Sequence, residues 1–145
     1  MPADLTVYAE EMGNGHGVGH AFISITQGGN TMTFGFYPDL GFPKNGIGPG
    51  IMREDGGHEY SGSWNVGKIS PLQLISIIND AKSFASSIYT LGGHNCADFV
   101  YAVIKSAGYQ INTMGTKTPN SVLNIINYKN MKSGKGNAPK TNRQC

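Results

Sequence analysis

The order of strand and helix signals restricts the possible folds of this 145-residue chain more than any other feature. Residues 5–9, 21–26 and 31–37 are β-prone, and the last two runs flank Gln27-Gly28-Gly29-Asn30, which is typical of a hairpin turn. The 21 glycines are concentrated before residue 70, so turns should separate these strands. The first half therefore predicts a small antiparallel sheet, with residues 39–57 as a long loop rich in glycine and proline.

The second half of the chain carries three helix signals. They are the capping box Ser70-Pro71-Leu72-Gln73 with proline at the first helical position, the apolar spacing of residues 96–107 before Gly108, and Thr118-Pro119. The apolar face of the first helix comprises Leu72, Leu74, Ile75, Ile78, Ala81, Ala85 and Ile88. Strands followed by helices are typical of an α+β domain, which is the fold class that we predict.

Length and composition indicate one domain with its own core. The hydrophobic content is 39%, and we assign the domain to residues 1–128, followed by a polar, basic and flexible tail over residues 129–145. A net charge of +2 without a basic stripe argues against nucleic acid binding. No apolar run reaches the roughly 18 residues of a membrane span, and the N-terminus lacks a secretory signal. We therefore expect no stable membrane insertion, and a cytoplasmic protein or one that leaves its producer without a classical signal.

Cys96 and His20 are the residues whose setting points to chemistry. Cys96 follows Gly92-Gly93-His94-Asn95 at the start of the second predicted helix, where free amides and the helix dipole stabilise a thiolate. His20 begins an apolar run and has small neighbours on both sides, which permits another group to approach closely. An imidazole beside the thiol would complete a cysteine nucleophile that needs no metal or cofactor. A buried structural thiol and a structural histidine are the alternative interpretations.

A third polar group should orient the histidine. Side chains alternate along strands, so Thr33 and Tyr37 on the returning strand should share the face of His20, and Thr33 is our candidate. His58 becomes a third member only if its loop folds back onto the site.

The remaining histidines and the second cysteine give weaker signals. His16 lies four residues before His20, but the glycines between them exclude the helix that a metal-binding pair needs. His94 and Cys96 are too sparse for a zinc site, so His94 either touches substrate or is solvated. Cys145 could form a disulfide with Cys96, although a cysteine at the end of a polar tail is poorly placed to stabilise the fold.

Two motifs carry a family resemblance. Asn95-Cys96-Ala97-Asp98-Phe99-Val100, preceded by Gly19-His20-Ala21-Phe22-Ile23, resembles the circularly permuted branch of the NlpC/P60 papain-like superfamily, over roughly residues 19–108. In that branch the histidine strand precedes the cysteine helix. The resemblance implies a papain-like fold with Cys96 as the nucleophile and His20 as the base. The chain departs from the pattern at the third position, where Thr33 stands near the usual polar residue.

The resemblance also implies a function. NlpC/P60-like enzymes mostly cut amide bonds in cell-wall peptides, so a cysteine amidase or peptidase acting on peptidoglycan peptides is expected. A small, signal-free member is also similar to the toxin domains that bacteria deliver into competitors, type VI secretion amidase effectors among them. Such effectors usually meet an immunity protein, and this one would act in the periplasm of the target cell. The alternatives are another acyl chemistry, namely deamidation, acyl transfer or lipid-ester hydrolysis, and a non-catalytic binding module on the same fold.

Overall fold

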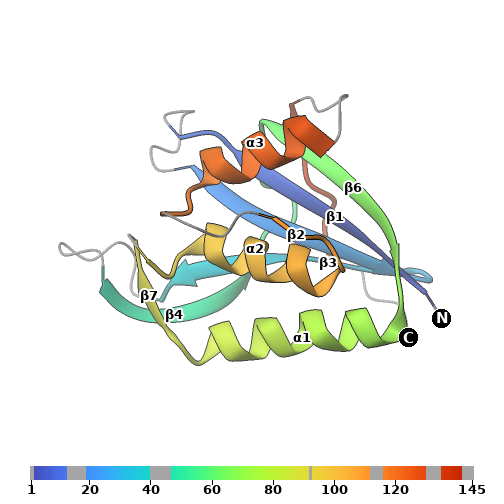
Figure 1. Ribbon diagram of the computed structural model, residues 1–145, viewed down its shortest axis with the longest axis horizontal. Helices are drawn as coiled ribbons and strands as arrows, with labels where there is room; N and C mark the ends of the chain where they lie inside the picture. The colour runs from blue at the N-terminus through green and yellow to red at the C-terminus, as the bar shows by residue number, and fades with distance from the viewer. Residues whose placement is uncertain are drawn as a thin grey trace.

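A six-stranded antiparallel sheet in the order β6-β1-β2-β3-β4-β7 is covered on one face by three helices (Figure 1). The computed structural model describes residues 2–12, 19–39, 47–91, 93–111, 116–129 and 135–141. The elements are β1 (Ala3–Glu10), β2 (His20–Gln27), β3 (Asn30–Pro38), β4 (Ile47–Glu54), β5 (Glu59–Tyr60), β6 (Gly62–Ile69), α1 (Pro71–Ala85), β7 (Ile88–Thr90), α2 (Cys96–Ser106), α3 (Pro119–Lys129) and β8 (Gly136–Asn137). The predicted α+β class is confirmed, and the sheet is larger than we expected.

The hairpin of β2 and β3 is the central pair of the sheet. Its register pairs Gln27 with Asn30 across a two-residue turn, in which Gly28 has a φ of 61°. The predicted hairpin is therefore confirmed. Strand β1 lies on the other side of β2, and its register places Glu10 opposite His20.

Strand β4 corrects the prediction that residues 39–57 form a loop. It pairs with β3 on one side and with β7 on the other. Gly50, in this strand, lies so close to Phe36 that a Cβ there would overlap the ring. The glycine that indicated a loop is thus a strand residue placed where a ring approaches the backbone. Residues 40–46, which belong to the same predicted loop, lie outside the described residues.

The core lies between the sheet and α2. Side chains of odd-numbered residues of β1 and β2 face the helices, and α2 is buried around most of its circumference. The buried residues that meet there include Leu5, Val7, Ala9, Ala21, Ile23, Phe99, Val100, Val103, Ile104, Val122 and Ile126. Burial at this density fixes α2 against the sheet, and with it the position of the residue that begins the helix.

The predicted helix boundaries are confirmed where the sequence carries a capping signal. Helix α1 begins at Pro71, and Ser70 and Gln73 form the reciprocal side-chain bonds of a capping box. Helix α2 is followed by Gly108, whose φ of 98° ends it as expected. Helix α3 begins at Pro119.

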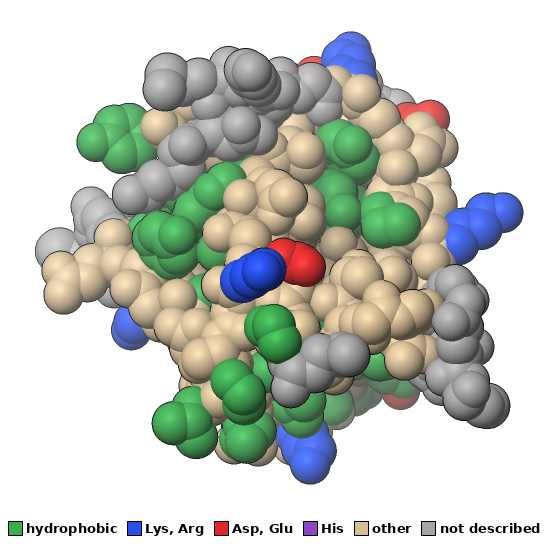
Figure 2. Space-filling model, turned by 90° about the vertical axis from the view of Figure 1, so that its right-hand side faces the viewer, with side chains coloured by type: hydrophobic (Ala, Val, Ile, Leu, Met, Phe, Trp, Pro, Cys, Tyr) green, Lys and Arg blue, Asp and Glu red, His purple; other side chains and the backbone are tan. Residues whose placement is uncertain are grey.

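The apolar face that we predicted for α1 is wrong in part. Leu72, Ile75 and Ile78 are 78%, 53% and 42% exposed, whereas Ile77 is fully buried and Ile88 lies in β7. Helix α1 packs at the edge of the molecule against α2 and β4, so only a narrow line of its side chains reaches the core. Figure 2 shows hydrophobic side chains gathered at its lower edge, the level at which Figure 1 draws α1.

Residues 135–141, which the sequence assigned to a polar tail, pack against the domain. Strand β8 pairs with β5, and Ala138 is buried against Tyr8 and Phe22 on the sheet face opposite the helices. Backbone hydrogen bonds hold a segment whose composition is polar. Residues 130–134 and 142–145, Cys145 among them, lie outside the described residues. Over the described part of the chain, no helix has the length and apolar character needed to cross a membrane.

Candidate active site

Cys96 is the first residue of α2, as the sequence predicts. Asn95 caps the helix: its Oδ1 accepts hydrogen bonds from the backbone N–H groups of Ala97 at 2.9 Å and Asp98 at 3.2 Å. The carboxylate of Asp98 in turn accepts the Asn95 N–H at 2.9 Å, which completes a capping box. Cys96 therefore lies at the positive end of the helix dipole, and its backbone position is fixed on both sides.

The Asn95 side chain also ties the helix start to two other segments. Its Nδ2 donates hydrogen bonds to the carbonyl oxygens of Leu91 and Lys117, each at 2.8 Å. Lys117 precedes α3, and its Nζ lies 3.8 Å from the Asp98 carboxylate. The position of Cys96 is thus tied, through the one buried amide of Asn95, to the segment after β7 and to the segment before α3.

We predict that Asn95→Ala destabilises the fold by about 2–3 kcal/mol, because it removes a helix cap and leaves the carbonyl oxygens of Leu91 and Lys117 without their donor. Denaturant unfolding measures the loss. Ser70→Ala is the matched control, since it removes the exposed cap of α1 and should cost about 1 kcal/mol. Equal losses for the two variants would contradict this role of Asn95.

His20 interacts with both Asp55 and Cys96. Its Nε2 is 3.0 Å from Asp55 Oδ2, and its other partner by hydrogen bonding and charge is the Cys96 thiol. All three residues are buried: His20 is 6% exposed, Asp55 4% and Cys96 5%. Burial by itself lowers the pKa of His20, but the hydrogen bond to Asp55 and the interactions with Cys96 outweigh burial and raise that pKa to about 9. The site thus favours a protonated imidazole next to the sulfur.

Asp55 is held in place from two sides. Its backbone N–H donates to the carbonyl oxygen of Thr33 at 2.8 Å, and its Oδ1 accepts a short hydrogen bond from the hydroxyl of Tyr37. Burial, followed by the Asp55 charge, raises the pKa of Tyr37, so this phenol stays a donor. Its ring lies 4.3 Å from the ring of His20, between centroids. Tyr37 therefore positions both the acid and the imidazole.

Asp55, and not Thr33, is the side chain that hydrogen-bonds His20, which corrects our placement of Thr33 beside the imidazole. Thr33 does lie on the sheet face of His20 and Tyr37, but it is four residues from Tyr37 along the strand, or about 13 Å. The Thr33 hydroxyl instead donates to the carbonyl oxygen of Pro139 at 2.8 Å. Asp55 was missed because it follows β4, in a region whose glycines and prolines predict a loop.

Gly35 makes room for the His20–Asp55 pair. A Cβ at this position would lie 2.7 Å from Asp55 Oδ2 and 2.9 Å from His20 Nε2. The absence of a side chain at residue 35 is therefore what lets the two groups meet above β3.

We predict that Gly35→Ala disrupts the His20–Asp55 hydrogen bond and destabilises the fold by about 1–3 kcal/mol through overpacking. Chemical denaturation measures the stability, and the NMR titration of the His20 ring reports the hydrogen bond. The control is Gly93→Ala, because the nearest atom to a Cβ there is 3.5 Å away, at Thr90 Oγ1. A Gly35→Ala protein with unchanged stability and His20 titration would contradict the packing argument.

Tyr89 on β7 is a second residue that the sequence did not reveal. It is buried, and its hydroxyl interacts with both the backbone N–H and the thiol of Cys96. Burial, followed by the negative charge of Cys96, raises the pKa of Tyr89. A neutral phenol beside the sulfur can donate a hydrogen bond to negative charge that forms there.

The other histidines lie near the pair but differ in role. The loop of His58 does fold back, and its ring lies 5.2 Å from the ring of His20, yet its Nδ1 bonds the Glu59 carbonyl oxygen at 2.7 Å. His94 is half-buried and stacks on Phe84 at 4.4 Å. His16 lies outside the described residues.

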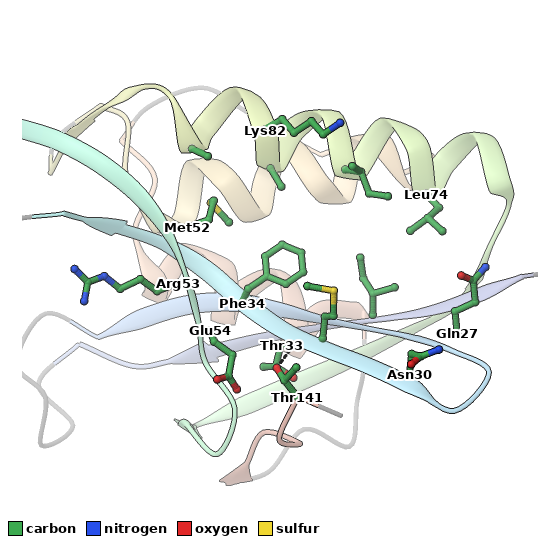
Figure 3. Close-up of a pocket in the computed structure, with 15 residues that line it drawn as sticks. Gln27, Asn30, Thr33, Phe34, Met52, Arg53, Glu54, Leu74, Lys82 and Thr141 are labelled. Carbon is green, nitrogen blue, oxygen red and sulfur yellow. Dashed lines mark hydrogen bonds between the residues drawn. The ribbon is translucent and has the colours of Figure 1, made fainter. Parts of the chain in front are cut away.

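A cavity of about 630 Å³ lies between α1 and strands β2, β3 and β4 (Figure 3). Its walls are mostly apolar, and include Ile25, Met32, Phe34, Met52, Leu74 and Ile78. Cys96, His20 and Asp55 are not among the lining residues. The cavity is therefore separate from the thiol and imidazole, although Thr33 and Thr141 form part of its rim.

Within the described ranges, no three His, Cys, Asp or Glu side chains are grouped so as to hold a metal ion. Comparisons of the chain with known protein families, with curated proteins and with solved structures find no match.

Proposed function

We propose that the protein is a cysteine hydrolase in which Cys96 is the nucleophile, His20 the general base and acid, and Asp55 the residue that orients the imidazole. The observation that supports this most strongly is that His20 Nε2 lies 3.0 Å from the Asp55 carboxylate, while Cys96 also interacts with His20 and raises its pKa. This is the arrangement that an activated cysteine nucleophile requires.

In the proposed reaction, His20 takes the thiol proton and Sγ attacks the carbonyl carbon of an amide. A carbon–sulfur bond forms and the carbonyl oxygen becomes an oxyanion, which the Tyr89 hydroxyl or a backbone N–H at the start of α2 can stabilise. His20 then protonates the leaving amine as the carbon–nitrogen bond breaks. Water, deprotonated by His20, attacks the thioester and releases the carboxylic acid and the thiol. No metal or redox partner enters these steps.

The proposed fold is the circularly permuted papain-like fold of the NlpC/P60 superfamily. Three features support it: the cysteine begins a buried helix, the histidine begins a strand of the antiparallel sheet under that helix, and the strand precedes the helix in the chain. We further propose peptidoglycan stem peptides as the substrate, on the resemblance of the Asn95-Cys96 and Gly19-His20 motifs. In this proposal the enzyme is an antibacterial effector that acts in the periplasm of a target cell, and an immunity protein blocks its site.

Digestion of purified peptidoglycan tests the substrate. The protein is incubated with insoluble sacculi, and the soluble products are identified by chromatography and mass spectrometry. We expect muropeptides in which one amide bond has gained a water, with a new amine and a new carboxylate. Intact sacculi after incubation with a folded protein that hydrolyses model amides or esters would overturn the wall substrate. Ammonia release in place of chain cleavage would indicate deamidation.

A further inference from the structure

Residues 135–141, named here the C-terminal strap, lie across the sheet face that carries His20. Strand β8 of the strap pairs with β5, with Gly136 opposite Tyr60 and Asn137 opposite Glu59. Ala138 is buried with Tyr8 and Phe22 on the same face. The strap is therefore packed, although it comes from the far end of the chain.

The strap is hydrogen-bonded to the turn that carries Asp55. The Gly57 N–H donates to the Ala138 carbonyl oxygen at 2.9 Å, and the Ala138 N–H donates to the His58 carbonyl oxygen at 2.9 Å. Within the turn, the His58 N–H donates to the Asp55 carbonyl oxygen at 3.0 Å. The Asn137 side chain adds a bond to the Gly57 carbonyl oxygen at 3.2 Å. The backbone of Gly57 and His58, just after Asp55, is thus hydrogen-bonded to the strap.

Thr33 connects the strap to Asp55 by a second route. Its hydroxyl donates to the Pro139 carbonyl oxygen at 2.8 Å, and its N–H donates to Thr141 Oγ1 at 3.4 Å. Its own carbonyl oxygen accepts the Asp55 N–H at 2.8 Å. Figure 3 shows Thr33 and Thr141 side by side below the cavity. The residue that we took for a catalytic group is instead the junction between the strap and Asp55.

We propose that the C-terminal strap is a positioning element for the catalytic pair: its docking holds the Asp55 turn against β3, so that Asp55 meets His20 Nε2. The inference rests on the proposed function for its effect on turnover, but not for its effect on His20. When the strap is removed, the Asp55 turn loses its bonds to Ala138 and Asn137, and Thr33 loses its bonds to Pro139 and Thr141. The His20 imidazole then stays in β2 but loses its hydrogen bond to Asp55.

The groups that face His20 decide how its titration is interpreted. They are Asp55, Cys96, Tyr37 and His58, together with Glu10, its partner in the β1–β2 register. Removal of the strap leaves all five residues in the chain. Greater exposure to water would raise the His20 pKa, so a fall of that pKa after strap removal reports loss of the interaction with Asp55.

Two truncations form the test. One ends at Gly134 and lacks the strap, and the matched control ends at Thr141 and keeps it. Both lack Cys145, so each has Cys96 as its single cysteine. Circular dichroism first establishes that both fold. We expect the His20 pKa, followed by NMR, to fall from about 9 toward or below the ordinary value of about 6.5 in the strapless protein alone. We also expect its kcat to fall about tenfold or more with little change in KM.

A folded strapless protein with the same His20 titration as the control would overturn the proposal. If the strapless protein does not fold, Thr33→Val replaces it, with Thr26→Val as the control because Thr26 bonds Thr31 on the same strand pair, away from the strap. Thr33→Val should shift the His20 titration in the same direction, and an unshifted titration would again overturn the proposal. If wild-type protein proves inactive on every amide while the His20 shift occurs, the proposed function fails and the positioning role stands.

Discussion

Replacing Cys96 by alanine is expected to lower the rate of amide hydrolysis by at least about three orders of magnitude, since the residual rate of such variants comes only from binding and oxyanion stabilisation. In the proposed reaction, the acyl intermediate forms on Cys96 Sγ. The measurement is the initial rate of amine release from purified peptidoglycan or from a model amide.

The Cys96→Ala protein should fold normally. The substitution removes one buried sulfur and leaves the Asn95 cap and the α2 packing in place, so the cost should be about 1 kcal/mol. The matched control is Cys145→Ala, which removes the other cysteine of the chain and should retain full activity. Retained amide hydrolysis in Cys96→Ala would exclude Cys96 as the nucleophile.

Replacing His20 by glutamine is the second large effect. We expect the rate to fall by about three orders of magnitude, because no group remains to take the thiol proton or to protonate the leaving amine. Glutamine keeps a polar side chain at the position next to Asp55, which limits the structural damage. The matched control is His94→Gln, whose ring stacks on Phe84 and should not be needed for proton transfer. Equal activities of the two variants would contradict the role of His20.

The same substitution should change how stability depends on pH. The folded protein raises the His20 pKa to about 9, above the ordinary value of about 6.5, so it holds the proton more tightly than the unfolded chain does. The resulting stabilisation is fully present below about pH 6.5 and is lost as the pH rises through about 9. Denaturant unfolding of wild type and His20→Gln across this range measures it. Parallel pH profiles would show that His20 makes no such contribution.

Local signals in the sequence predicted the parts of the site that depend on local structure. The apolar spacing of residues 96–107 and the following Gly108 predict the bounds of α2, and the residues around Gly28 predict the hairpin that carries His20. These features were predictable because caps and turns are made by neighbouring residues.

Contacts between distant segments account for what the sequence did not reveal. Asp55 follows a strand in which Gly50 permits close packing against Phe36, and composition alone cannot tell such a strand from a loop. Tyr89 reaches Cys96 only because β7 pairs with β4 at the edge of the sheet. The polar strap is ordered by partners about 80 residues earlier in the chain, such as the Gly57 carbonyl that Asn137 bonds. The exposed part of the α1 apolar face reflects its place at the edge of the molecule.

The central claim is that Cys96, His20 and Asp55 act as one unit, and the pH dependence of Cys96 alkylation tests it most directly. A mild neutral electrophile is used on a Cys145→Ala background, so that one thiol reacts, and modification at Cys96 is established by mass spectrometry. The thiolate is the reactive form, and a protonated imidazole beside it keeps it available at neutral pH.

We predict rapid alkylation at pH 6–7 that Asp55→Asn slows and His20→Gln slows at least about tenfold, because the group that takes the thiol proton is misplaced or lost. Circular dichroism spectra establish that all three proteins are folded, so that differences in rate arise in the site. Equal alkylation rates of the wild-type protein and of His20→Gln at pH 6–7 would contradict the account.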